Sequence, residues 1–142
     1  MIKYNVFINT DLKGVVTMGK FVIKLSGTGY SYSLKAGNGE TIAVSSRNQS
    51  DISAVKAIIA DIINYAPEAP VEDQTAANYQ PAGGAKFEIY KDKAEQFRFR
   101  LKNAKGEILG VSEGYIKKDS CKNGINSVRR NAVNSPVIEP EG

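Results

Sequence analysis

The chain has 142 residues, of which 42% are hydrophobic and 24% are charged. This composition is typical of a soluble globular protein, so a disordered chain is not the expectation. Its 19 Lys and Arg residues outnumber its 15 Asp and Glu residues, which gives a formal net charge of +4. That charge is compatible with contacts to nucleic acid or other polyanions, but many proteins of this size carry as much.

The chain contains no histidine and a single cysteine, Cys121. Histidine is the side chain most often used for proton transfer near neutral pH, and zinc sites are built mainly from histidine and cysteine. The sequence also lacks a Gly-rich phosphate-binding loop and a Ser-centred nucleophile motif. We therefore predict a protein that is not an enzyme and that uses no cofactor or metal ion.

A single cysteine cannot form an intramolecular disulfide, and residues 1–14 lack the continuous apolar segment of a signal peptide. No apolar run approaches the roughly 20 residues that cross a bilayer. We therefore expect a cytoplasmic protein that makes no contact with a membrane.

Residues 1–18 are predicted to form an N-terminal extension. Polar and apolar side chains alternate from Lys3 to Ile8, and apolar residues return after a turn at 11–14. This pattern indicates one or two short strands added to the first repeat. The alternative is that the repeat begins near Gly19 and that everything before it is appended.

Two copies of one pattern follow, and the second, Lys86 to Ala132, is the clearer. Phe21 in the first copy matches Phe87 at an offset of 66 residues. One extra residue in a hairpin loop raises the offset to 67 in the middle section, and it returns to 66 in the last third. The matching pairs are Tyr30 and Phe97, Tyr32 and Phe99, Leu34 and Leu101, Val44 and Val111, Ser45 and Ser112, Val55 and Cys121, Ile59 and Ile125, and Ile62 and Val128. This agreement indicates a tandem repeat.

Each copy is predicted to contain three strands followed by a helix. In the second copy, apolar and polar residues alternate through 86–91, 97–102 and 108–111, which is typical of an antiparallel sheet with one buried face. Gly39 and Gly106 supply the tight turns of the hairpins.

Apolar residues then recur at helical spacing, so one stripe of each helix is expected to face the sheet. Ser50 and Asp119 are the expected N-cap residues of the two helices. A short extended segment follows each helix, at 69–72 and 135–138, and we predict a fourth, edge strand at each.

The two repeats are predicted at 19–73 and 85–142, with a polar, Ala-rich linker at 74–84. About 50 residues bury too little apolar surface for a comfortably stable domain. The copies are therefore expected to pack together.

Two stretches resemble the YegP-like family, a group of small bacterial and archaeal proteins of unknown function. They are GKFVIK followed by GYSYSLKAGNGETIAVSS, and AKFEIYKDKAEQFRFRLKNAKGEILGVSEGY followed by SCKNGINSVRRNA. The second is the closer match and keeps Gly114-Tyr115 and the run from Cys121 to Ile125. The first lacks the Gly-Tyr pair and has the run from Val55 to Ile59 instead.

The resemblance implies an α+β fold. Two β-β-β-α-β units, as tandem repeats or as two subunits, build one antiparallel sheet, with two helices on one face and exchanged C-terminal strands. It implies no catalytic residue, because no reaction is established for the family.

The strand alternation places basic side chains on the sheet face opposite the helices. They are Lys20, Lys24, Lys35, Lys86, Arg98, Arg100 and Lys102, with Ser31, Ser33, Tyr90 and one acid, Glu88, among them. The candidate contacts to nucleic acid or another anion are Lys86, Arg98, Arg100, Lys102 and Tyr90. The alternative is an ordinary solvated strand surface in which Glu88 pairs with Arg100. Tyr90 is the one aromatic residue available for stacking, which argues against sequence-specific RNA recognition.

A second candidate is the patch that follows the family pattern, namely Glu113, Tyr115, Cys121, Asn123 and Gly124. Glycine inside a helix costs about 1 kcal/mol relative to alanine, so Gly124 requires a reason. Either the helix approaches the sheet or the other repeat closely, or the missing side chain opens a slot for a ligand. Cys121 is expected to be a small buried hydrophobe, and the alternative is a redox-active thiol near several lysines.

We predict a small non-enzymatic protein or binding module with an unidentified partner. The alternative function is weak, non-specific binding of nucleic acid or another polyanion through the basic sheet face. A carboxylate-based enzyme would require a cleft that holds two acids such as Glu107 and Glu113. We expect a monomer whose repeats pair within the chain rather than an obligate oligomer.

Overall fold

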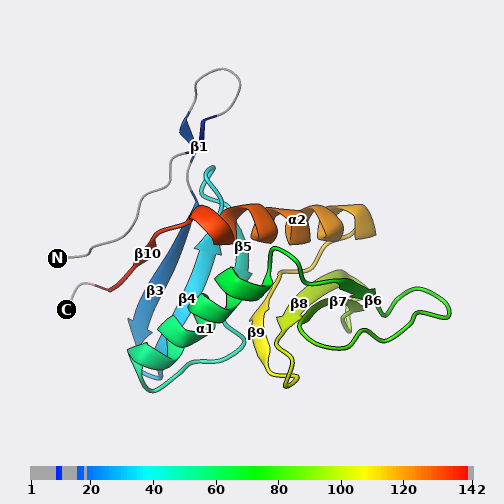
Figure 1. Cartoon of the computed structure of the whole chain (residues 1–142), viewed down its shortest axis with the longest axis horizontal. Helices are drawn as coiled ribbons and strands as arrows, with labels where there is room; N and C mark the ends of the chain where they lie inside the picture. The colour runs from blue at the N-terminus through cyan, green and yellow to red at the C-terminus, as the bar shows by residue number, and fades with distance from the viewer. Residues whose placement is uncertain (1–8, 11–15, 18, 141–142) are drawn as a thin grey trace.

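The computed structural model describes residues 9–10, 16–17 and 19–140, and shows two helices lying on one face of a single large sheet (Figure 1). The strands of this sheet are β3 (Lys20–Ser26), β4 (Gly29–Lys35), β5 (Thr41–Val44), β6 (Val71–Asp73), β7 (Lys86–Lys91), β8 (Phe97–Lys102), β9 (Ile108–Val111) and β10 (Val137–Ile138). The helices are α1 (Ile52–Tyr65) and α2 (Lys118–Asn134).

The N-terminal extension is described only in part. Its two short strands, β1 (Asn9–Thr10) and β2 (Val16–Thr17), pair with each other in an antiparallel sheet of their own. The alternating stretch at 3–8 lies outside the described residues.

The eight strands follow the order β10-β3-β4-β5-β9-β8-β7-β6. The last strand of each repeat therefore leaves its own unit and pairs with the first strand of the other. Val137 lies opposite Phe21, and Val71 lies opposite Phe87. Val71 and Val137 are 66 residues apart, and so are Phe21 and Phe87. Because 66 is the repeat offset, the two exchanges are equivalent. This confirms the α+β fold with exchanged C-terminal strands.

The sheet is mixed rather than wholly antiparallel. The six central strands pair antiparallel as two meanders, but β10 and β6 run parallel to their neighbours. The reason is topological, because each edge strand comes back from a helix that has crossed the sheet. The two meanders meet at β5 and β9, where Val44 lies opposite its repeat counterpart Val111.

The helices begin where loop geometry permits rather than at the expected cap residues. Asp51 is the N-cap of α1, and its carboxylate accepts a hydrogen bond from Ser53 N at 3.0 Å. Lys117 occupies the cap position of α2 without a side-chain capping bond. The predicted caps Ser50 and Asp119 were therefore wrong, the first by one residue and the second because Asp119 lies inside the first turn. Within the described part of the chain, no helix has the length and apolarity needed to cross a membrane.

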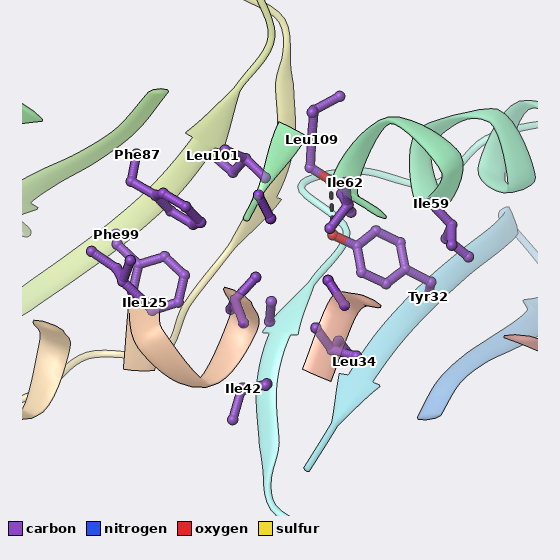
Figure 2. Packing of buried hydrophobic residues seen from close by; sticks show 14 of the residues in the cluster. Tyr32, Leu34, Ile42, Ile59, Ile62, Phe87, Phe99, Leu101, Leu109 and Ile125 are labelled. Carbon is purple, nitrogen blue, oxygen red and sulfur yellow. Dashed lines mark hydrogen bonds between the residues drawn. The ribbon is translucent and has the colours of Figure 1, made fainter. Parts of the chain in front are cut away.

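The core lies between the helices and the sheet, and the two repeats share it (Figure 2). Equivalent aromatic pairs occupy its two halves: Phe21 packs edge-on against Tyr32, and Phe87 packs edge-on against Phe99. The Tyr32 hydroxyl donates a hydrogen bond to the Leu109 carbonyl of the other repeat at 2.8 Å. The matched helical positions and the pair Tyr32 and Phe99 are buried, as the alignment predicted. The pair Tyr30 and Phe97 is only partly buried, at the border of this core.

Candidate functional site

Two buried acids lie on the outer face of the sheet, the face opposite the helices. Glu72 on β6 and Glu88 on β7 are register partners, and each is only 3% exposed. Lys86 bridges them, with its Nζ 2.8 Å from Glu72 Oε1 and 3.3 Å from Glu88 Oε2. The hydrogen bonds from Lys86 and then Gln74 lower the pKa of Glu72 to about 2, although burial opposes the shift. Both acids therefore remain ionised at neutral pH.

Two further cations complete this cluster. Arg100 Nε lies 2.6 Å from Glu88 Oε1, and Lys102 Nζ lies 3.1 Å from the same oxygen. Burial alone would raise the pKa of Glu88, but the hydrogen bonds from these two cations hold it below its usual value. The Arg100 guanidinium also stacks over the Tyr90 ring at 4.3 Å. Tyr90 therefore already has a cation on its face.

Arg98 is paired outside the cluster. Its Nε lies 2.6 Å from Asp92 Oδ2, and its guanidinium also donates to the Ser112 carbonyl. The Asp92 carboxylate raises the pKa of Arg98. The structure thus places the predicted anion contacts Lys86, Arg98, Arg100, Lys102 and Tyr90 on one face, but acids of the same face neutralise its cations.

Sequence reasoning counted one acid on this face and missed Glu72 and Asp92. A signal for Glu72 was available, because exchange of the C-terminal strands at the repeat offset brings it beside Glu88. Asp92 follows the last residue of β7, so the alternation of residues along the strand does not assign it to a face. Only the geometry of the turn reveals its contact with Arg98.

The first-repeat half of the outer face is different. We call Lys20, Lys24 and Lys35 the lysine strip. None of the ion pairs among the described residues involves these lysines. Val22 and Ile138 stand where the other half has Glu88 and Glu72. The strip therefore carries positive charge without the acids that balance its counterpart.

The patch that follows the family pattern is closed by its own side chains. A Cβ at Gly124 would lie 2.7 Å from the Tyr115 hydroxyl and 3.0 Å from Phe99 Cε2. The glycine thus lets α2 approach the sheet and leaves room for Tyr115, which occupies the space where a slot was considered. Burial, followed by the nearby Glu113, Cys121 and Glu40, raises the pKa of Tyr115 to about 12.

The remaining patch residues do not lie together in one site. Cys121 is fully buried, and burial raises the pKa of its thiol to about 11, which keeps it protonated. Glu113 and Asn123 are exposed. Among the described residues, no cluster of three or more His, Cys, Asp or Glu side chains could hold a metal ion.

A groove of about 640 Å³ lies at the junction of the repeats, and we call it the junction groove. Its walls are the stripe Ala54, Ala57, Ile58 and Asp61 of α1, the loop residues Ser45, Ser46, Arg47 and Gln49, and the hairpin residues Asn103, Gly106, Glu107 and Ile108, with Tyr32 and Leu109 also in the lining. This volume is within the range of small-molecule sites. Glu107 contributes to the lining but Glu113 does not, so the structure does not bring these two acids together in this groove.

The second repeat fills the equivalent space. Tyr115 and Gln49 are counterparts, because each pairs by backbone hydrogen bonds with one of two matched strand residues, Tyr115 with Phe97 and Gln49 with Tyr30. Where the second repeat has Tyr115 over Gly124, the first has Gln49 and Ile58. The junction groove is thus open where its counterpart contains an aromatic ring.

The comparisons with known proteins agree with the repeats and the fold. A UPF0339 protein of Treponema denticola is 56% identical over 54 residues, which are 38% of this chain and 93% of that protein. A UPF0339 protein of Methanosarcina acetivorans is 44% identical over the same shares of each chain. The match thus amounts to about one repeat, in proteins little longer than a repeat.

Among solved structures, YegP from E. coli, described as a protein of unknown function, has a TM-score of 0.71 and 28% identity. The alignment covers 91% of this chain and 98% of YegP. A UPF0339 protein of Shewanella oneidensis matches with a TM-score of 0.68 at 24% identity, over 85% of this chain and 90% of that chain. None of these names indicates a specific function. The family described as "Domain of unknown function (DUF1508)" matches residues 26–73 and again 92–139, and this chain therefore belongs to it, as a tandem pair.

Proposed function

We propose that this protein is a non-enzymatic binding module and that the lysine strip on its outer sheet face binds polyanions such as nucleic acid. The observation that carries the proposal is the contrast between the two halves of that face. Arg98, Arg100, Lys86 and Lys102 are ion-paired, whereas Lys20, Lys24 and Lys35 form none of the ion pairs among the described residues.

The surroundings of the strip support a phosphate ligand. Lys20 and Lys35 are register partners on β3 and β4, and Lys24 lies further along β3 opposite Ser31. Ser31, Ser33 and Thr41 add hydroxyl groups on the same face, and the Lys35 ammonium lies 3.3 Å from Thr41 Oγ1. Ammonium and hydroxyl groups are the donors that proteins direct to phosphate backbones.

The expected binding is weak and independent of sequence. Arg100 already lies over one face of the Tyr90 ring, and Tyr90 is in the other half of the sheet face, so the lysine strip has no aromatic ring of its own for base stacking. Three lysines that each contact one phosphate predict a slope of log affinity against log salt of roughly −2.7 for duplex DNA. The proposal places this module in the cytoplasm, supported by its single, buried cysteine, and as a monomer, because the strand exchange is satisfied within the chain.

The test is a fluorescence anisotropy titration of a labelled DNA duplex at about 50 mM salt, repeated at about 200 mM. The wild-type chain is expected to bind at the lower salt and to lose affinity steeply at the higher. The triple variant K20Q/K24Q/K35Q is expected to lose the binding. Replacing Arg100 or Lys102 is a poor test, because it would remove a partner of buried Glu88. Replacing Arg98 would leave Asp92 without its ion pair.

The matched control is K93Q/K105Q/K122Q, which removes the same charge from exposed lysines in two hairpin turns and on α2. It should bind nearly as well as the wild type. Equal losses in the two triple variants would show a net-charge effect and contradict the assignment to the strip. No anisotropy change for the wild type at the lower salt would remove the proposal.

A further inference from the structure

The junction groove contains three charged side chains that form no ion pair within the described part of the chain. Arg47 comes from the loop before α1, Asp61 from α1, and Glu107 from the β8–β9 hairpin. Neither Arg47 nor Asp61 belongs to any ion pair among the described residues. Glu107 accepts a hydrogen bond from the neutral Asn103 amide at 3.0 Å. The groove thus offers a cation and two anions to a ligand.

The rest of the lining combines apolar surface with backbone-like hydrogen-bonding groups. Ala54 and Ala57 on α1 are small, and Ile58 and Leu109 add aliphatic surface. The side-chain amide of Gln49 can donate and accept hydrogen bonds. The Asn103 amide is already bonded within the hairpin, to Lys105 N, Glu107 N and the Glu107 carboxylate. This mixture suits a ligand that is itself a short stretch of peptide.

The size of the groove fits such a ligand. The α1 stripe from Ala54 to Asp61 rises roughly 10 Å along the helix axis, at 1.5 Å per residue. An extended peptide spans about 3.3 to 3.6 Å per residue, so three residues match that length.

We propose that the junction groove binds short peptides of two or three residues through both of their charged termini. Arg47 binds the terminal carboxylate, since a guanidinium matches a carboxylate in bidentate geometry. Asp61 and Glu107 bind the terminal ammonium, and a small aliphatic side chain packs against Ile58. This site is separate from the lysine strip and does not depend on polyanion binding.

The site is a property of the first repeat alone. In the second repeat, Tyr115 lies against α2 and close enough to Glu40, in the β4–β5 hairpin, for that acid to raise its pKa. Tyr115 therefore occupies the space between helix and hairpin that is open in the first repeat. The first repeat has Gln49 and Ile58 in place of Tyr115 and Gly124, and it therefore lacks the ring that would fill the groove.

The experiment is a ¹H–¹⁵N NMR titration of the full chain with the tripeptide Ala-Leu-Ala, which has free termini. Amide shifts are expected for the lining residues of the groove, and the variants R47Q and D61N should each weaken binding by about tenfold. A tripeptide acetylated at its N-terminus and amidated at its C-terminus should bind more weakly still. The matched controls are R130Q and D119N, which remove the same charges from exposed positions on α2 and should leave the affinity unchanged.

A second variant tests the groove itself. Q49Y/I58G transfers the Tyr115 and Gly124 pair of the second repeat to the first, where it should close the groove and abolish the shifts while the spectrum stays folded. The proposal is overturned if wild type shows no shifts at about 10 mM peptide, a concentration that would nearly saturate a site with a Kd of 1 mM. Shifts on the outer sheet face alone, equal binding of the blocked peptide, or unchanged binding by R47Q and D61N would overturn it too.

Discussion

At the scale of single residues, the two repeats differ in side-chain size at matched core positions. Tyr32 corresponds to Phe99, and Gly110 corresponds to Ala43. The Tyr32 hydroxyl reaches Leu109 across the junction, and a Cβ at Gly110 would clash with that hydroxyl. The absence of a side chain at Gly110 thus lets Tyr32 tie the repeats together.

The variant G110A is therefore expected to destabilise the chain by about 1–3 kcal/mol, the usual cost of overpacking. The double variant Y32F/G110A reproduces the Phe99 and Ala43 pair of the other half and should recover most of the loss. Urea denaturation of the wild type, both single variants and the double variant measures this coupling. If the two effects simply add, with no recovery, the clash with Tyr32 is not the cause.

Some residue roles were predictable and others were not. Burial of Cys121 and the need for a small residue at Gly124 follow from helical spacing and from the cost of glycine in a helix. The identity of the neighbour, Tyr115, does not, because it depends on how the preceding loop folds back. The N-caps failed for the same reason, since a cap is defined by loop geometry as well as residue type.

At the scale of elements, the exchanged strand β6 is attached to the second repeat by charge as well as by backbone pairing. Lys86 on β7 binds Glu72 on β6, and Ala82 N of the linker donates to the same carboxylate at 2.8 Å. The equivalent edge, β10 on β3, has Ile138 and Val22 at these positions instead. The two exchanges therefore share one geometry but use different side-chain chemistry.

We expect K86M to lower the free energy of unfolding at pH 7 by about 3–5 kcal/mol, because it leaves two buried carboxylates less compensated. The matched control is K20M at the equivalent position, because Lys20 forms none of the ion pairs among the described residues. It should change the free energy of unfolding by no more than about 0.5 kcal/mol. Chemical denaturation compares the two. Equal effects would mean that the cluster adds nothing to stability.

The same cluster predicts a pH dependence. The pKa of Glu72 is about 2 in the fold against an ordinary value of 4.5, so its ionised form stabilises the fold above pH 4.5. This contribution decreases as pH falls from 4.5 towards 2. The stability deficit of K86M should therefore shrink over that range, as measured by denaturation at pH 3 and pH 7. A deficit that is independent of pH would contradict the role of ionised Glu72.

At the scale of the whole molecule, one sheet and one core are built from two units that each lack an edge strand of their own. β10 completes the first unit and β6 completes the second, and each helix contacts strands of both repeats. Residues 85–142 alone would leave β7 without β6 and β10 without β3. In a dimer of this segment, β10 of each copy could pair with β7 of the other, in the parallel register seen here.

The excised segment 85–142 is therefore expected to be dimeric or poorly folded. Sedimentation equilibrium and thermal melts at several concentrations distinguish these states from a monomer, since the melting temperature of a dimer rises with concentration. A stable monomer would show that the exchange is not required for the fold of a single repeat.

The sequence by itself determined the repeat, the strand and helix order and the buried positions, because hydrophobic periodicity and turn residues are local signals. Exchange of the C-terminal strands was implied by the family resemblance. The strand register also predicted that Glu88 pairs with Arg100, as the structure has it. Only the tertiary structure decided which other charges meet. Glu72 comes beside Glu88 through the exchange, and Arg47, Asp61 and Glu107 share a groove through the packing of α1 against a distant hairpin. These neighbours are set by long-range contacts, which no local pattern in the chain encodes.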